Sequence, residues 1–200
     1  MRPSWAANME NLMHASRILL ALYLLIGVTT MPEAAQVVAE PTPGEPFPHS
    51  LAATDQNGAS QSLRSLMGPK GLAVFFVRSA DWCPFCMGQL VDANRHLPAF
   101  KAAGLKVVSI SVDEVPLLAQ FAKAQGIGYT MLSDPTGAIN LSLGIRDEQY
   151  PVGSKAFGVP RPTLYVLDAK GVVRLRYQEK TYRTRPDLDA VIRDVKALGL

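Results

Sequence analysis

Both cysteines of the chain lie in one short stretch, Asp81-Trp-Cys-Pro-Phe-Cys86, and are separated by two residues. An apolar run rich in Val and Phe, residues 72–77, precedes this stretch. A pattern typical of a helix, residues 87–103, follows it. A strand that leads into a Cys-x-x-Cys at a helix start is a setting in which a dithiol can do redox chemistry. The stretch therefore requires a buried strand, a short loop and a helix in direct succession.

The start of a helix favours a reactive sulfur for physical reasons. Unpaired backbone N–H groups and the positive end of the helix dipole stabilise a thiolate, and such sites lower a cysteine pKa from about 8.5 to roughly 3.5–7.5. Pro84 suits the first helical position, because the N–H that it lacks would have had no partner there. We expect Cys83 to be the exposed, attacking sulfur and Cys86 to be the more buried, resolving sulfur.

A plain stabilising disulfide or half of a zinc site is the alternative interpretation of the two cysteines. A four-ligand zinc site would need more soft ligands than His14, His49 and His96 supply. We therefore expect neither a metal nor another cofactor. The net charge of +3 is too small to indicate a nucleic-acid partner.

Residues 1–39 have the pattern of a signal peptide or membrane anchor. An uncharged apolar run, residues 18–31, follows Arg17 and ends before Pro32. This run is shorter than the ~20 residues that span a bilayer and matches the apolar part of a signal peptide, with an uncleaved tether as the second choice. We predict an extracytoplasmic protein, periplasmic or secreted, in a compartment where disulfide chemistry is permitted.

The rest of the chain divides into a linker and one domain. Residues 40–49 carry four prolines and are predicted to form a stiff, extended linker. Residues 50–200 form the domain, with a hairpin over residues 50–63, an irregular loop over 146–158 and a helix over 135–143 that Asp134 caps. Further strands are expected at 106–112, 129–132, 163–167 and 172–177, and further helices at 116–125 and 186–198. This order predicts an α/β fold with a mixed central sheet flanked by helices and an N-terminal β-hairpin.

Three motifs give the chain a family resemblance. It resembles the thioredoxin-fold redoxins, specifically the peroxiredoxin-like AhpC/TSA branch with a thioredoxin-type Cys-x-x-Cys, over about residues 47–195. The residues that carry the resemblance are Phe75-Phe76 with Trp82-Cys83-Pro84-Phe85-Cys86, Leu132-Ser133-Asp134-Pro135, and the stretch Pro162–Gly171. The resemblance implies a thioredoxin-like domain.

The resemblance also implies roles for two residues far from the dithiol. Pro162 matches the proline that faces the dithiol in the cis form, and the backbone of Arg161 could then pair with a substrate strand. Arg161 also matches the arginine that assists the peroxide-reacting cysteine of peroxiredoxins, whose position corresponds to Cys86. Three departures weaken peroxide reduction more than dithiol exchange. Cys83 occupies the position of the peroxiredoxin threonine, the proline that peroxiredoxins carry earlier in this loop is not evident in residues 77–81, and Val77 occupies the position of the buried acid of thioredoxin.

Three functions follow, in order of preference. The first is an exported thiol–disulfide oxidoreductase, with a possible antioxidant role, in which Cys83 attacks a protein disulfide, Cys86 resolves the mixed disulfide and an external thiol reductant or oxidant resets the pair. Trp82 would offer a flat apolar contact beside the sulfur, with Pro84, Arg161 and Pro162 in support. The second is a thiol peroxidase in which peroxide oxidises Cys86 and Cys83 resolves. The third is a redox-inert binding module with a structural disulfide.

Overall fold

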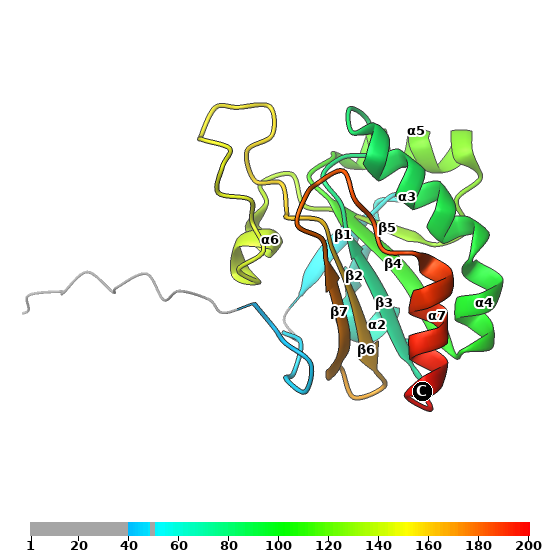
Figure 1. The fold of residues 1–200 in the computed structure, drawn as a ribbon. Helices are drawn as coiled ribbons and strands as arrows, with labels where there is room; N and C mark the ends of the chain where they lie inside the picture. The colour runs from blue at the N-terminus through cyan, green and yellow to red at the C-terminus, as the bar shows by residue number, and fades with distance from the viewer. Residues whose placement is uncertain (1–39, 49–50) are drawn as a thin grey trace, which may run out of the picture. The chain divides into compact units, whose positions relative to one another are not determined.

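The computed structural model describes residues 40–48 and 51–200, which Figure 1 draws in colour. The predicted leader, residues 1–39, lies outside the described residues, so the signal peptide, the tether and the extracytoplasmic location stay predictions. Among the described residues, no helix combines the length and the apolar character that a membrane span requires.

Seven strands form a single mixed sheet at the centre of the domain, in the order β2-β1-β5-β4-β3-β6-β7. Neighbouring strands β3, β4 and β5 are parallel, whereas β1, β6 and β7 each pair antiparallel with the strands beside them. The strands are β1 (Ala52–Asp55), β2 (Ser60–Ser62), β3 (Gly71–Phe76), β4 (Leu105–Ser111), β5 (Thr130–Ser133), β6 (Thr163–Asp168) and β7 (Val173–Gln178). The predicted mixed sheet and N-terminal hairpin are confirmed.

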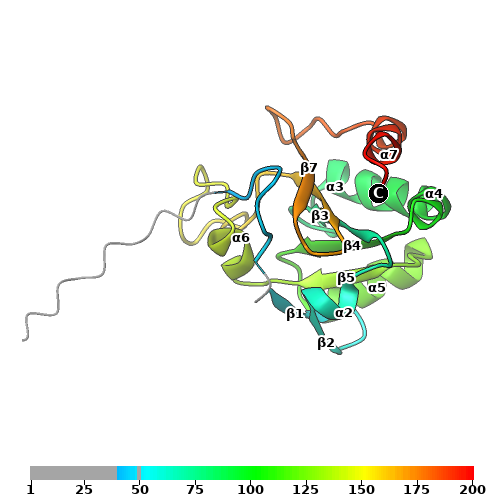
Figure 2. The ribbon, with the colours of Figure 1, turned by 90° about the horizontal axis from the view of Figure 1, so that it is seen from below.

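Helices cover both faces of this sheet. The helices are α2 (Leu63–Leu66), α3 (Pro84–Arg95), α4 (Leu97–Ala102), α5 (Val115–Gln125), α6 (Ala138–Ser142) and α7 (Leu188–Ala197). Figures 1 and 2 show α3 and α4 on one side of the strands and α6 on the other. Alternate residues of β3 point to opposite faces, so Ala73 and Phe75 pack towards α3, α4, α5 and α7, while Leu72 and Val74 pack towards the segment that contains α2.

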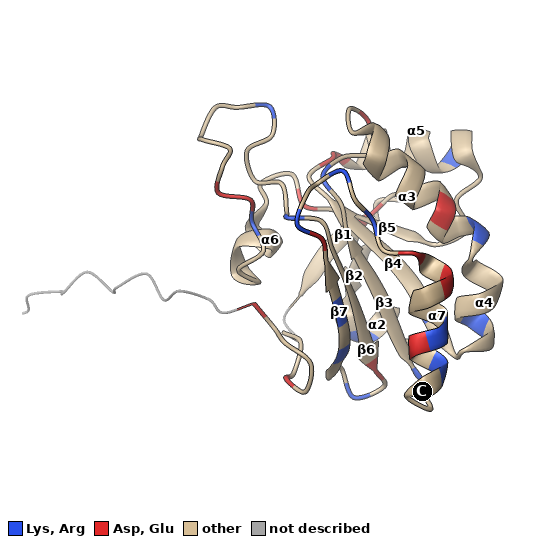
Figure 3. Ribbon diagram, in the orientation of Figure 1, with Lys and Arg blue, Asp and Glu red and all other residues tan. Residues whose placement is uncertain are grey.

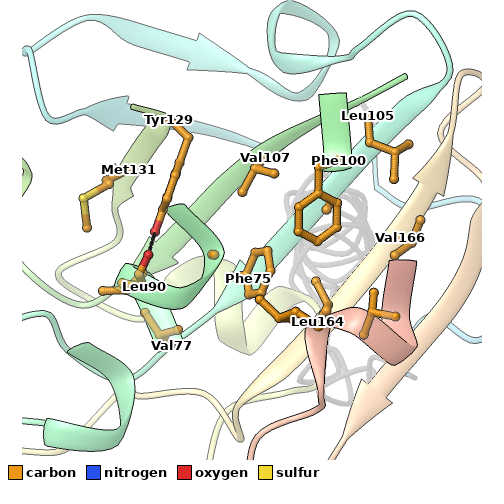
Figure 4. Close-up of a cluster of buried hydrophobic side chains, with 14 of the residues drawn as sticks. Phe75, Val77, Leu90, Phe100, Leu105, Val107, Tyr129, Met131, Leu164 and Val166 are labelled. Carbon is orange, nitrogen blue, oxygen red and sulfur yellow. Dashed lines mark hydrogen bonds between the residues drawn. The ribbon is translucent and has the colours of Figure 1, made fainter. Parts of the chain in front are cut away.

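Aromatic contacts hold α3 and α4 on the sheet (Figure 4). The rings of Phe75 in β3 and Phe100 in α4 meet edge to face, with centroids 6.1 Å apart. The Tyr129 hydroxyl donates a 3.0 Å hydrogen bond to the carbonyl of Leu90, a fully buried residue of α3. This hydrogen bond fixes the centre of the helix that carries the dithiol.

The proline-rich segment, predicted as a linker, packs on the domain over residues 40–48. Phe47 is fully buried, and its amide donates to the carbonyl of Gly171 at 2.8 Å. The amide of Gly44 donates to the carbonyl of Val173, again at 2.8 Å. The segment thus lies beside the start of β7 instead of serving only as a spacer.

Helix α6 begins later than predicted, and Gly137 rather than Asp134 is its N-cap. Gly137 has a φ of 68°, and a Cβ there would lie 2.3 Å from the carbonyl oxygen of Gly158, so only glycine fits. The Asp134 carboxylate instead reaches over a turn and accepts from the amides of Ile139 at 3.0 Å and Asn140 at 3.3 Å. Burial raises the pKa of Asp134 to about 6 despite these bonds.

The loop between β3 and α3 is tied to the end of β4 by Asp113, which is buried. Its carboxylate accepts from the Ser79 hydroxyl and the Ala80 amide, both at 2.6 Å, and from the Ser111 hydroxyl at 2.7 Å. The Ser79 oxygen in turn accepts from the amide of Trp82 at 3.3 Å. This network positions the residues immediately before the dithiol.

We predict that Asp113→Ala lowers the free energy of unfolding by roughly 3 kcal/mol, because it leaves several buried donors without an acceptor. Ser111→Ala, which removes one of these bonds, should cost only about 1 kcal/mol. Urea denaturation of both variants measures the difference. Equal losses in the two variants would show that Asp113 does not anchor the loop.

The pKa of Asp134 predicts a pH-dependent stability. Because the folded-state pKa of about 6 lies above the ordinary value of 3.8, this group stabilises the fold most below about pH 3.8, and that contribution is lost as the pH rises through about 6. Asp134→Asn cannot ionise, so its stability relative to the unmodified protein should rise between pH 4 and pH 7.5 by up to ~3 kcal/mol. Parallel unfolding free energies across this pH range would contradict the prediction.

Candidate active site

The two cysteines stand at the start of α3, as predicted. Cys83 is the N-cap residue, Pro84 is the first residue of the helix, and the Cys86 amide donates to the Cys83 carbonyl at 3.0 Å. The two sulfurs are joined in a disulfide, with Cα atoms 5.2 Å apart. The structure therefore shows the oxidised dithiol with the first turn of the helix intact.

Both cysteines are buried, with exposed fractions of 3% for Cys83 and 0% for Cys86. The prediction of an exposed Cys83 is therefore wrong. Cys83 belongs to the buried cluster on the face of the sheet that α3 covers. The loop between β7 and α7 reaches the same segment: the Tyr182 ring lies edge to face with the Phe85 ring at 6.1 Å, and Arg185 contacts Cys86. Figure 1 shows this loop crossing from the end of β7 towards α7.

Arg185 is the cation that contacts the dithiol. Its Nη2 donates to the Cys86 sulfur at 3.4 Å, and its Nη1 donates to the carbonyls of Tyr182 and Thr184. Burial, and to a smaller extent the charge of Arg78, lower the pKa of Arg185 to about 10, so it is still a cation at neutral pH. A guanidinium beside a sulfur favours the thiolate of the reduced cysteine.

A second arginine, Arg78, lies close by and is 5% exposed. Its guanidinium carbon is 5.1 Å from the ring centre of Trp82, 4.9 Å from that of Tyr150 and 4.6 Å from that of Tyr182. The half-buried Trp82 thus packs against the Arg78 cation. The Nζ of Lys155 also lies over the Trp82 ring, 5.8 Å from its centre. Figure 3 shows basic positions along the loop between β7 and α7 and acidic positions at its two ends.

Arg161, which the resemblance assigned to Cys86, has other partners in the structure. Its guanidinium pairs with Glu40 and donates to the carbonyls of Gly144 at 2.7 Å and Arg146 at 3.3 Å. Glu40 also pairs with Arg176 of β7. The structure therefore brings Arg185, rather than Arg161, to the Cys86 sulfur.

Pro162 lies at the edge of the sheet from which the dithiol loop departs, since its neighbour Thr163 pairs with Phe76. The predicted cis form is wrong, because the described residues contain no cis peptide bond. The predicted open backbone of Arg161 is wrong as well: its amide donates to the carbonyl of Ile145 at 2.7 Å, and its carbonyl accepts from the Thr163 hydroxyl at 2.8 Å. These contacts hold the segment against residues 145–146.

Sequence reasoning missed three residues of the site. Asp113 had a detectable signal, because polar side chains follow both β3 and β4, and the carboxyl ends of parallel neighbours meet at one sheet edge. Arg185 had none, since it lies 99 positions from Cys86 in a loop without a motif. Arg78 had none either, because its three aromatic neighbours come from separate segments. Within residues 40–48 and 51–200, no cluster of three or more His, Cys, Asp or Glu could hold a metal.

Comparisons with known proteins agree with this geometry. The model of the AhpC/TSA family matches residues 43–176. The chloroplastic peroxiredoxin Q of Populus jackii is 32% identical over 152 residues, which are 76% of this chain and 67% of that protein. The corresponding protein of Sedum lineare is 32% identical over 164 residues, 81% of this chain and 82% of that protein.

A solved structure extends the likeness to three dimensions. The peroxidoxin BcpB of Mycobacterium tuberculosis superposes with a TM-score of 0.68 at 21% identity, covering 80% of this chain and 99% of that one. At that identity the likeness shows the fold, and it confirms the predicted thioredoxin-like α/β architecture. With the family model matching most of the domain, the chain belongs to the AhpC/TSA family and is a peroxiredoxin-like oxidoreductase.

Proposed function

We propose that this protein is a thiol peroxidase in which Cys86 reacts with peroxide and Cys83 resolves the product. The observation that carries the proposal is the guanidinium of Arg185 at 3.4 Å from the Cys86 sulfur. A peroxide-reacting cysteine must be a thiolate, and this contact favours the thiolate at Cys86 rather than at Cys83. The likeness to peroxiredoxin Q supports a peroxidase activity for the chain. The roles of the two sulfurs are thus the reverse of those preferred from sequence.

The reaction has two steps inside the protein. In the first, the Cys86 thiolate attacks one peroxide oxygen, the O–O bond breaks, and the other oxygen takes a proton and leaves as alcohol or water. Cys86 is thereby oxidised to a sulfenic acid. In the second, Cys83 gives up its proton and attacks the Cys86 sulfur, so that the S–S bond forms and the sulfenic oxygen leaves as water.

An external thiol reductant completes the cycle. Two thiol groups, oxidised to a disulfide, return Cys83 and Cys86 to the reduced state. The substrates are therefore a peroxide and a thiol or dithiol. If residues 1–39 direct export as the sequence predicts, both substrates are met outside the cytoplasm.

Replacement of the usual threonine by Cys83 is compatible with this cycle. The resolving sulfur lies in the same helical turn as the reacting one, and the two already form a disulfide with their Cα atoms 5.2 Å apart. Resolution therefore needs no distant cysteine. The chain contains only these two cysteines.

Thiol–disulfide exchange is the second candidate. It is favoured by the same closed Cys-x-x-Cys at a helix start, which is how dithiol exchange enzymes arrange their sulfurs. In that mechanism Cys83 attacks and Cys86 resolves. The two candidates therefore assign opposite roles to the cysteines.

Single cysteine variants separate the two candidates. We predict that Cys83→Ser still forms a sulfenic acid at Cys86 with one equivalent of hydroperoxide, whereas Cys86→Ser does not, because only Cys86 supplies the attacking sulfur. Dimedone labelling followed by intact-protein mass measures the product. Exchange is supported instead if Cys86→Ser traps a mixed disulfide at Cys83 and neither variant forms sulfenic acid.

We further predict that Arg185→Met makes thiolate formation at Cys86 less favourable. The midpoint pH for thiolate formation should rise by about one unit or more, because a charge-assisted hydrogen bond to the sulfur is lost. The pH dependence of iodoacetamide alkylation, measured in the Cys83→Ser background, gives this midpoint. Arg185→Lys should restore part of the shift.

Arg161→Met serves as the matched control for this measurement. The guanidinium of Arg161 contacts Glu40 and not Cys86. The Arg161→Met variant should therefore have the same midpoint pH for thiolate formation as the unmodified protein. If the midpoint pH rises in Arg161→Met and not in Arg185→Met, then Arg161, the arginine that the family resemblance selects, stabilises the Cys86 thiolate.

A further inference from the structure

Arg78 and Arg185 form a pair of basic groups beside the dithiol that has no acidic partner among the described residues. Neither arginine belongs to any of the ion pairs in this part of the chain. The Nε atoms of both are buried without a hydrogen-bond partner. The two cations share a neighbour, since Arg78 lies over the Tyr182 ring at 4.6 Å and Arg185 donates to the Tyr182 carbonyl. A desolvated, unpaired cation is costly, so this arrangement favours the entry of an anion.

The single negative charge of the reduced dithiol does not neutralise the two positive charges of Arg78 and Arg185. A Cys86 thiolate supplies one negative charge, and Arg185 is the residue that contacts it. The charge of Arg78 is then left without a counterpart, and in the oxidised state both charges are. The site consequently has the electrostatic capacity for one anionic group of a ligand in addition to the thiolate.

The surroundings of Arg78 specify the kind of anion. Its guanidinium is held by the faces of Trp82, Tyr150 and Tyr182 at 4.6–5.1 Å. Ring faces attract the cation, but they do not provide the oxygen acceptors that its N–H donors require. A guanidinium has a planar fork of N–H donors that matches a carboxylate with two parallel hydrogen bonds. The rings add an apolar surface for the rest of the ligand.

We propose that Arg78, together with Arg185, binds the carboxylate of an organic hydroperoxide and so makes the enzyme selective for peroxides that carry this group. The inference rests on the proposed peroxidase function and narrows its substrate class. Arg185 links the two parts of the site, since it contacts the reacting sulfur and also Tyr182, whose ring Arg78 contacts. Phe85, which is 43% exposed, contacts the Tyr182 ring and extends this apolar surface.

The test compares two hydroperoxides of the same shape with the full chain. Cumene hydroperoxide is the neutral substrate, and its para-carboxylate derivative is the anionic one. The protein should show a higher kcat/KM for the carboxylate, and Arg78→Met should lower the carboxylate-to-neutral ratio by about tenfold or more, as expected for loss of hydrogen bonds to a charged group. Arg161→Met, whose guanidinium is paired with Glu40, should leave the ratio unchanged.

Three outcomes overturn the proposal. They are a ratio of one in the unmodified protein, an equal loss for both hydroperoxides in Arg78→Met, and an equal fall of the ratio in the Arg161→Met control. If Arg78→Met does not fold, calorimetric titration of the unmodified protein with benzoate and with benzamide decides. Benzoate should bind at least tenfold more tightly, and equal binding contradicts the proposal. Failure of the unmodified protein to reduce cumene hydroperoxide would instead refute the peroxidase function, and the benzoate titration would still test the anion site.

Discussion

The hydrogen bond from Arg185 to the Cys86 sulfur connects the two parts of the chain on which the chemistry depends. The sulfur belongs to the first turn of α3, and the arginine belongs to the loop that joins β7 to α7. The helix start and the guanidinium both favour negative charge at the same atom. Both cysteines are buried, and through Arg185 the loop between β7 and α7 contacts the Cys86 sulfur directly.

The rest of the fold holds these two parts in place. Asp113 fixes the loop before Cys83 to the end of β4, and the hydrogen bond from Tyr129 to Leu90 fixes the middle of α3. Arg78 joins three segments through the rings of Trp82, Tyr150 and Tyr182. The site is therefore built from one helix start and from loops that meet at one edge of the sheet.

The sequence predicted what depends on local pattern. The apolar run before Cys83, the helix start at Pro84 and the hairpin around residues 55–58 each follow from nearby residues, and the structure has them all. The helical pattern over residues 87–103 is divided in the structure between α3, which ends at Arg95, and α4, which begins at Leu97. The family resemblance, carried by the residues around the dithiol, was confirmed by the family match.

What depends on distant contacts could not be predicted. Arg161 pairs with Glu40, which lies in a segment that composition alone describes as a spacer, whereas Arg185 contacts Cys86. The buried Cys86 is contacted by Arg185, which lies 99 positions away in the loop between β7 and α7. Side-chain pairing across such separations leaves no periodic signal, because it depends on the tertiary fold and not on neighbours in sequence.

The central claim is that the protein environment makes Cys86 a fast-reacting thiolate towards peroxide. The most direct measurement is the second-order rate constant of the reduced full chain with hydrogen peroxide, compared at the same pH with that of dithiothreitol. The account predicts that the protein reacts at least about a hundredfold faster, since preorganised donors at a reacting atom contribute rate factors of that order. A rate constant equal to that of the small dithiol would contradict it.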